Sequence, residues 1–160
     1  MVDFATTSCA EFRYDSAYVA PAFVCGDESL KDEAGEAIGP LAMRHPGMDV
    51  ANNKTTSYFL GRKTRGARWV TFLSADLASQ LNLSVLSEVA DIRISHMEHG
   101  IRTMASEAPE IGDKTQQVDT PGLRAVAAAL RPISFSGDHN LSRLLGGDRT
   151  RVTEWEKRFH

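Results

Sequence analysis

Histidines beside carboxylates are the residues of this chain best suited to acid–base or metal chemistry. His96, Glu98 and His99 lie within four positions of one another, and His139 follows later. A protein zinc site needs three or four such ligands at set distances. Residues 92–98 alternate between apolar and polar side chains as a strand does, and residues three apart in a strand point to opposite faces. We therefore expect His96 and His99 to diverge, and we predict no metal site and no cofactor.

No motif of a known catalytic class accompanies these histidines. The segment GRKTRG lacks the spacing and the Lys-Ser/Thr ending of a phosphate-binding loop, and neither GxGxxG nor GxSxG occurs. Cys9 and Cys25 carry no local signature of a Cys–His pair. We predict that the chain is not an enzyme. The alternative is a small enzyme or metal-dependent hydrolase that uses His96, His99 and His139 with nearby carboxylates.

Carboxylates form two groups that suit a basic protein partner. Asp32 and Glu36 lie one turn apart on the same side of a predicted helix, where repulsion costs a few tenths of a kcal/mol. A later polar segment adds Glu107, Glu110 and Asp113. We predict that these five residues bind the partner. The alternative for the helical pair is a solvated helix front, since helix starts favour acidic residues.

A basic turn at Arg62, Lys63, Arg65 and Arg68 has the opposite charge. We expect it to be a solvated loop before a strand, and the alternative is a contact for an acidic or phosphate-bearing partner. Four charges without interleaved aromatic residues are weak evidence for nucleic-acid binding. The formal net charge of −3 also disfavours general binding to phosphates. We predict no nucleic-acid partner.

Hydrophobic periodicity and turn residues predict the elements that must position these side chains. The expected elements are two strands within 12–24 that turn near Asp15–Ser16, a helix from Asp27 or Ser29 to His45–Pro46–Gly47, a strand over 67–73, short helices over 75–81 and 85–90 capped by Ser74 and Ser84, a strand over 92–98 continued by 101–104 as a hairpin, a long loop over 107–120, a helix from Pro121 to Pro132, and a terminal helix over 150–160. Strands and helices mix without a βαβ rhythm. This order predicts an α+β fold with a mostly antiparallel sheet packed against helices.

The length of 160 residues fits a single domain, 1–160, that folds without a metal. Its predicted core includes Leu41, Trp69, Phe72, Leu73 and Val126. If residues 9–24 form a hairpin, Cys9 and Cys25 are out of register, so we expect two buried thiols rather than a disulfide.

The location of the chain is predicted from what its sequence lacks. The longest apolar-leaning stretch, 17–25, contains a proline and is far too short to cross a bilayer. Residues 1–10 carry an acidic residue and no Lys or Arg, unlike the start of a secretory signal. We predict a cytoplasmic protein that has no contact with a membrane.

Several segments, in order, resemble the type VI secretion immunity family (the TsiV-like group). These are SAYVAPAFV before an acidic helix that runs into LAMRHPGMDV, then GARWVTFLSADLASQL, APEIGD, LRAVAAALRPI and the ending EWEKRF. They cover most of the chain from Ser16 onward. The family is longer at its front, which implies that this chain is short or trimmed there.

The resemblance implies that the chain is an immunity protein in competition between bacteria. Such a protein binds a cognate secreted toxin and neutralises it by covering its active surface. Binding of this kind needs complementary shape and charge more than reactive groups. The mildly acidic chain suits a basic toxin that acts in the cytoplasm, such as a nuclease. A structural adaptor of the secretion machinery is a further alternative, and the sequence leaves the oligomeric state open, a homo-oligomer included.

Overall fold

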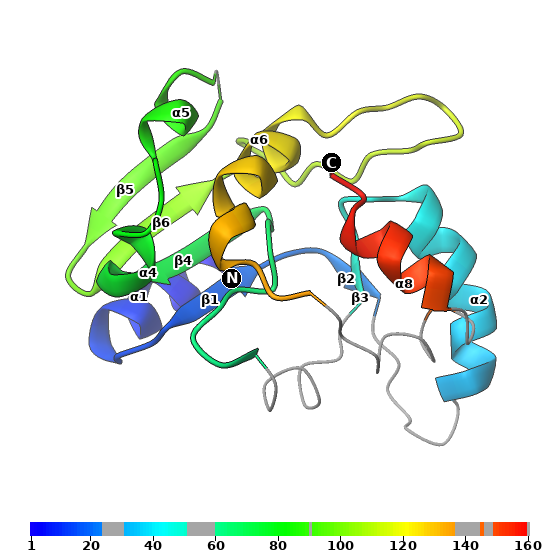
Figure 1. Cartoon of the computed structure of the whole chain (residues 1–160), viewed down its shortest axis with the longest axis horizontal. Coiled ribbons are helices and arrows are strands. Elements are labelled where there is room, and N and C mark those ends of the chain that lie inside the picture. The colour runs from blue at the N-terminus through cyan, green and yellow to red at the C-terminus, as the bar shows by residue number, and fades with distance from the viewer. Residues whose placement is uncertain (24–30, 51–59, 90, 137–144, 146–148, 160) are drawn as a thin grey trace.

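A computed structural model of the chain describes residues 1–23, 31–50, 60–89, 91–136, 145 and 149–159, and of residues 31–33 only the backbone (Figure 1). Cys25, His139 and the predicted helix start at Asp27 or Ser29 lie outside these residues, as does the side chain of Asp32. In chain order the elements are α1 Val2–Glu11, β1 Ser16–Val19, β2 Ala22–Phe23, α2 Lys31–Arg44, β3 Asp49–Val50, β4 Val70–Ser74, α4 Ala75–Ala78, α5 Ser84–Ser87, β5 Arg93–Met97, β6 Gly100–Met104, α6 Pro121–Leu130, a 3-10 helix Arg131–Ile133 and α8 Arg149–Glu156.

A four-stranded sheet in the order β1-β4-β6-β5 is the centre of the fold, and its neighbouring strands are all antiparallel. The predicted hairpin is confirmed: β5 and β6 pair from Arg93–Met104 to Met97–Gly100. Together with the helices around it, this sheet confirms the predicted α+β class with a mostly antiparallel sheet.

The strand β4 sends successive side chains to the two faces of the sheet. On one face, Leu73 packs with Ile101 and with buried residues of α4, α5 and α6. On the other face, Val70 and Phe72 pack with Cys9 of α1. The sheet is therefore covered by α4–α6 on one side and by α1 on the other.

A second region lies beside the sheet and contains α2, α8 and the parallel pair β2-β3 (Figure 1). Its buried apolar residues come from α2, β3 and α8, with Leu145 between them. Gly39 of α2 lies against the backbone of Leu145, where an added Cβ would stand 3.1 Å from the Leu145 carbonyl oxygen. A larger residue at position 39 would therefore press on this backbone, which would have to shift by a few tenths of an ångström.

The predicted hairpin within residues 12–24 is wrong. The strand β1 pairs with β4, and β2 pairs with β3, so the two neighbouring strands belong to different sheets. Cys9 lies in α1 rather than in a strand, and its thiol is buried and free, as predicted. Helix α1 was not anticipated, although Val2, Ala5 and Cys9 share one helical face and pack together.

Core positions from the sequence agree with the structure for Phe72, Leu73 and Val126, which are fully buried. Trp69 is half-buried, and its indole N–H donates to the Ser106 carbonyl. The prediction for Leu41 is wrong, since 43% of this residue is exposed. The buried face of α2 instead follows Gly35, Gly39 and Ala42, because these small residues allow close approach of the neighbouring segment; Leu41 lies off that face.

Local predictions for the short helices are confirmed in part. Ser74 caps α4, where its hydroxyl accepts from the Leu77 amide, and α6 begins at Pro121 as predicted. The predicted cap at Ser84 is wrong, because Ser84 is the first residue of α5 and the preceding Leu83 makes no capping bond with its side chain. Helices α4 and α5 end at Ala78 and Ser87, each three residues before the predicted end. Within the part of the chain that the structure describes, none of the helices is long and apolar enough to cross a membrane.

Candidate functional site

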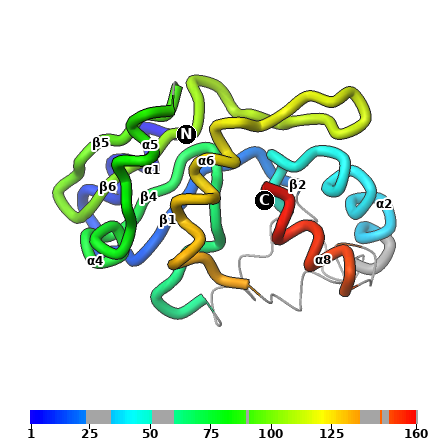
Figure 2. Tube along the Cα trace, turned by 45° about the horizontal axis from the view of Figure 1, so that its top comes forward, coloured from blue at the N-terminus to red at the C-terminus, as the bar shows by residue number. Residues whose placement is uncertain are grey.

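The long loop between β6 and α6 is the first candidate for binding a partner. Residues 107–120 contain no helix or strand, as predicted, and the loop runs as two arms from the start of α6 along one edge of the molecule (Figures 1 and 2). The arms approach each other at a single bridge between Asp113 and Val118. The tip beyond this bridge lies near the C-terminal end of α2, where the Lys114 amide donates to the Arg44 carbonyl.

Glu110, a predicted partner-binding residue, binds the body of the protein. Its carboxylate accepts hydrogen bonds from the amides of Gly122 and Leu123, at 3.2 and 2.9 Å. Thr120 precedes α6 but makes no capping bond with its side chain. The first amides of a helix have no partner within the helix. Glu110 therefore caps α6 from outside and holds the loop to it.

Asp113 is also engaged within the protein. Its carboxylate accepts from the Nε and Nη2 atoms of Arg44, the latter at 2.6 Å, and from the amides of Thr115 and Gln116. The hydrogen bond from Arg44 holds the pKa of Asp113 well below its usual range. This carboxylate joins the loop to α2 and shapes the turn that follows it.

The remaining predicted positions are arranged differently. Glu107 and Glu36 are exposed, Glu107 at the start of the loop and Glu36 on α2. Glu36 precedes Arg44 by eight residues, which is about 12 Å along a helix. Glu110 and Asp113 thus both bind inward at the base of the loop, to α6 and to α2 respectively, and Glu36 lies farther along α2. The alternation of charge and small residues in APEIGD gave no indication that two of its carboxylates bind inward.

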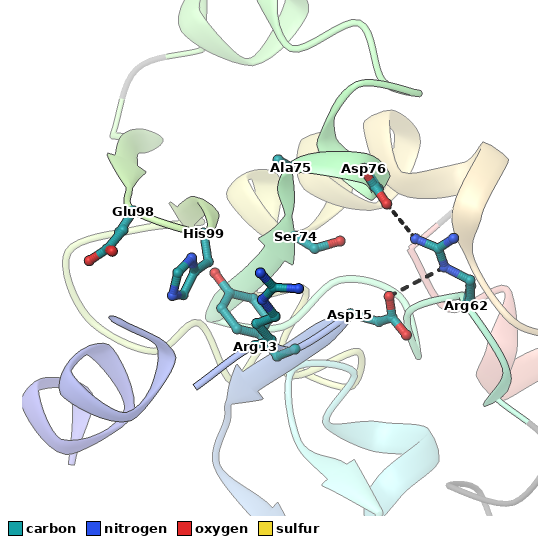
Figure 3. Close-up of a pocket in the computed structure, with 9 residues that line it drawn as sticks. Arg13, Asp15, Arg62, Ser74, Ala75, Asp76, Glu98 and His99 are labelled. Carbon is teal, nitrogen blue, oxygen red and sulfur yellow. Dashed lines mark hydrogen bonds and ion pairs between the residues drawn. The ribbon is translucent and has the colours of Figure 1, made fainter. Parts of the chain in front are cut away.

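A polar cleft of about 550 Å³ lies at the end of the sheet (Figure 3). Arg62 joins two carboxylates at its edge, with Nη2 at 2.6 Å from Asp76 and Nε at 3.4 Å from Asp15. Glu98 and His99 come from the turn between β5 and β6. The cleft therefore brings together charges of both signs, one imidazole and a hydroxyl-bearing cap, Ser74.

His96 and His99 do not meet in this cleft, and His139 lies outside the described residues. His99 lines it, whereas His96 is exposed on β5 and is not among the lining residues. Among the described residues, no three His, Cys, Asp or Glu side chains are grouped so as to hold a metal ion. The cleft holds the titratable groups that an acid–base enzyme needs, but Arg62 is already ion-paired with both Asp15 and Asp76.

The basic turn differs from its prediction, because two of its four cations are buried. The Arg68 guanidinium donates to Asp49 at 2.9 Å, and Arg65 lies 3.6 Å from the same carboxylate. Arg65 also donates to the Tyr18 hydroxyl. Arg62 remains exposed. The turn is thus a structural element, and the expectation of a fully solvated loop is wrong for Arg65 and Arg68.

Asp49 carries the negative charge of this buried cluster and is 1% exposed. Burial by itself would raise its pKa, but the charges of Arg68, Arg65 and Arg158 outweigh burial and lower the pKa below its ordinary value. Arg158 also stacks on the Trp155 ring, 3.6 Å from its centroid. The cluster joins the start of β4 to α8. Sequence reasoning missed it, since its members are far apart in the chain.

The fold of this chain is similar to that of a solved structure. No curated protein matches the chain. The solved structure of the Pseudomonas aeruginosa T6SS protein PA0821 has the same fold, with a TM-score of 0.69 and 19% sequence identity. The similarity covers 99% of this chain and 47% of that one, so this chain spans about half the length of its structural neighbour.

The comparison with protein families is more specific. The family TsiV, described as type VI immunity for VRR-NUC, matches residues 3–159. This match takes in nearly the whole chain, and it agrees with the family to which the order of the sequence segments pointed. The chain therefore belongs to the TsiV family of type VI immunity proteins.

Proposed function

We propose that this chain binds a VRR-NUC nuclease toxin of type VI secretion in the cytoplasm of the producing cell and neutralises it by covering its active surface, without catalysis of its own. The observation that carries this proposal is the family match over residues 3–159, whose description names that class of nuclease. One feature of the fold supports it. A long polar loop is presented on the surface of the folded body, and such loops are common recognition elements.

In the proposed complex, opposite charges on the two proteins increase the association rate. A nuclease binds phosphates with a basic surface, and exposed carboxylates on the immunity protein would steer such a surface. Of the five predicted positions, Glu36 and Glu107 have exposed side chains that can act in this way. Glu110 and Asp113 contribute by holding the loop in place. Asp32 belongs to the same proposal through its position one turn before Glu36.

The test measures binding of this chain to a catalytically inactive VRR-NUC domain of a type VI toxin, together with protection of cells that express the active toxin. We expect a tight one-to-one complex whose association slows as salt is added. The variant Glu36→Lys/Glu107→Lys should associate at least tenfold more slowly, because it places like charges opposite each other.

The matched control is Glu88→Lys combined with Glu98→Lys, which makes the same change of net charge at exposed residues of the sheet region. It should associate nearly as fast as the parent. If the parent chain neither binds the nuclease nor protects cells, the proposed function is wrong. If the association rates of both double variants fall by the same factor, the net charge of the chain controls association and no particular acidic surface does.

A further inference from the structure

The loop 107–120 is fixed by hydrogen bonds along its length, although it contains no helix or strand. The amides and carbonyls of Asp113 and Val118 bond to each other in both directions, each at 2.9 Å. The Gly47 amide donates to the Ile111 carbonyl at 2.8 Å, and His45 Nδ1 lies 2.8 Å from the Gly112 carbonyl. Long irregular loops are uncommon in compact domains and are usually functional when they are ordered.

Glycines let the base of this loop pack directly on the backbone of the body. A Cβ added at Gly47 would stand 1.7 Å from the Glu110 carbonyl oxygen, and one added at Gly122 would stand 1.9 Å from that of Ala105. Gly112 has a φ of +70°, which favours glycine, and a Cβ there would be 2.9 Å from Pro46. The loop base is therefore in close contact with the body at two points, Gly47 against Glu110 and Gly112 against Pro46, and Gly122 brings the start of α6 close to the end of β6, on either side of the loop.

The tip, residues 114–118, is exposed at every position, and the backbone amides of Lys114, Thr115, Gln116 and Val118 are hydrogen-bonded to Arg44 and Asp113. Its sequence is KTQQV, so its one formal charge is on Lys114. Val118 exposes 53% of its surface. Gln117 adopts a φ of +56°, a left-handed conformation that is unfavourable for a non-glycine residue. Strain of this kind persists where the surrounding structure imposes it, and it is concentrated at binding and active sites.

From the braced base and the strained, exposed tip we propose that residues 114–118 are the main anchor of the complex. This inference rests on the proposed function. The tip enters a recess of the nuclease that offers an apolar contact to Val118 and uncharged hydrogen-bonding groups to Thr115, Gln116 and Gln117. A rigid loop loses little conformational entropy on binding, so its contacts contribute more of their energy to affinity. The carboxylates set the association rate, whereas the tip sets the dissociation rate.

The experiment measures association and dissociation rates with the same inactive VRR-NUC domain, at low and at high salt. The variants are Val118→Ala and Gln117→Gly, because glycine keeps the left-handed backbone while it removes the carboxamide. The matched control is Val85→Ala on α5, since Val85 is 54% exposed, nearly the same as Val118. Thermal unfolding of each variant should stay close to that of the parent, as all three side chains are exposed.

The double variant Val118→Ala/Gln117→Gly should dissociate from the nuclease at least tenfold faster than the parent. Its association rate should change little. The ratio of the two dissociation rates should be the same at low and at high salt. If the tip variants dissociate as slowly as Val85→Ala while the parent binds tightly, the anchor is elsewhere and only this inference is wrong. If the parent does not bind, the proposed function and the inference both fail.

Discussion

The sheet with helices α4–α6 and the neighbouring α2–α8 region are stabilised by different kinds of contact. The first has apolar residues buried on both faces of its sheet, among them Leu73 and Leu123 on the α4–α6 face and Phe72 on the α1 face. The second has a small apolar cluster around Val50 and Trp155, and beside it the buried ion pair of Asp49 and Arg68. Apolar burial is favourable without exact geometry. A buried charge is tolerated only with a well-placed partner. The second region should therefore be more sensitive to single polar changes and to pH.

The strongest test of the comparison removes an apolar side chain from the sheet. Phe72→Ala should lower the free energy of unfolding by about 3–5 kcal/mol, because the ring is fully buried and a cavity would remain. Denaturant unfolding measures this loss, which should be nearly independent of pH. Phe4→Ala is the control, since 77% of Phe4 is exposed and its loss should cost less than about 0.5 kcal/mol. A small effect at Phe72 would contradict the apolar sheet core.

Asp49→Asn tests the charged region. It should cost about 3 kcal/mol at neutral pH, because Arg68 and Arg65 stay buried without their counter-charge. The pKa of Asp49 is lowered in the folded state, so its contribution is complete above the unfolded value of about 4 and is lost as the pH falls through the folded pKa.

Unfolding measured from neutral pH to below pH 4 should therefore show the parent approaching Asp49→Asn in stability. Asp76→Asn is the control, since the exposed Asp76–Arg62 pair should contribute little to stability. A constant gap between the parent and Asp49→Asn across this range would mean that hydrogen bonding, and not charge, accounts for the role of Asp49.

The smallest expected effect is at Glu110, whose carboxylate is only half-buried. Glu110→Ala should cost about 1 kcal/mol, because the first amides of α6 lose their acceptor. Denaturant unfolding measures this loss, and Glu107→Ala on the same loop should be nearly neutral since Glu107 is exposed. If Glu110→Ala lowered the free energy of unfolding as much as Asp49→Asn does, the degree of burial of a carboxylate would not explain the greater sensitivity of the α2–α8 region.

The candidate site was predicted only in part, for a reason visible in Asp113. The sequence predicted the loop 107–120 from its polarity and its turn residues, and it also pointed to Glu107, Glu110 and Asp113. It could not tell which of these side chains face solvent. Asp113 binds Arg44, 69 positions earlier, and Glu110 binds amides 12 and 13 positions later. Sequence patterns report local periodicity, and these pairings are not local.

Local physical chemistry was enough to determine several elements. Alternation predicted the β5-β6 hairpin, and proline with apolar periodicity predicted α6, because backbone geometry repeats over a few residues. Only the tertiary structure decided that β1 and β2 join different sheets, that Leu41 is exposed, and that Arg65 and Arg68 are buried around Asp49. A charged side chain looks the same in the sequence whether it meets water or a partner. Its burial depends on a counter-charge that only the folded chain brings within reach.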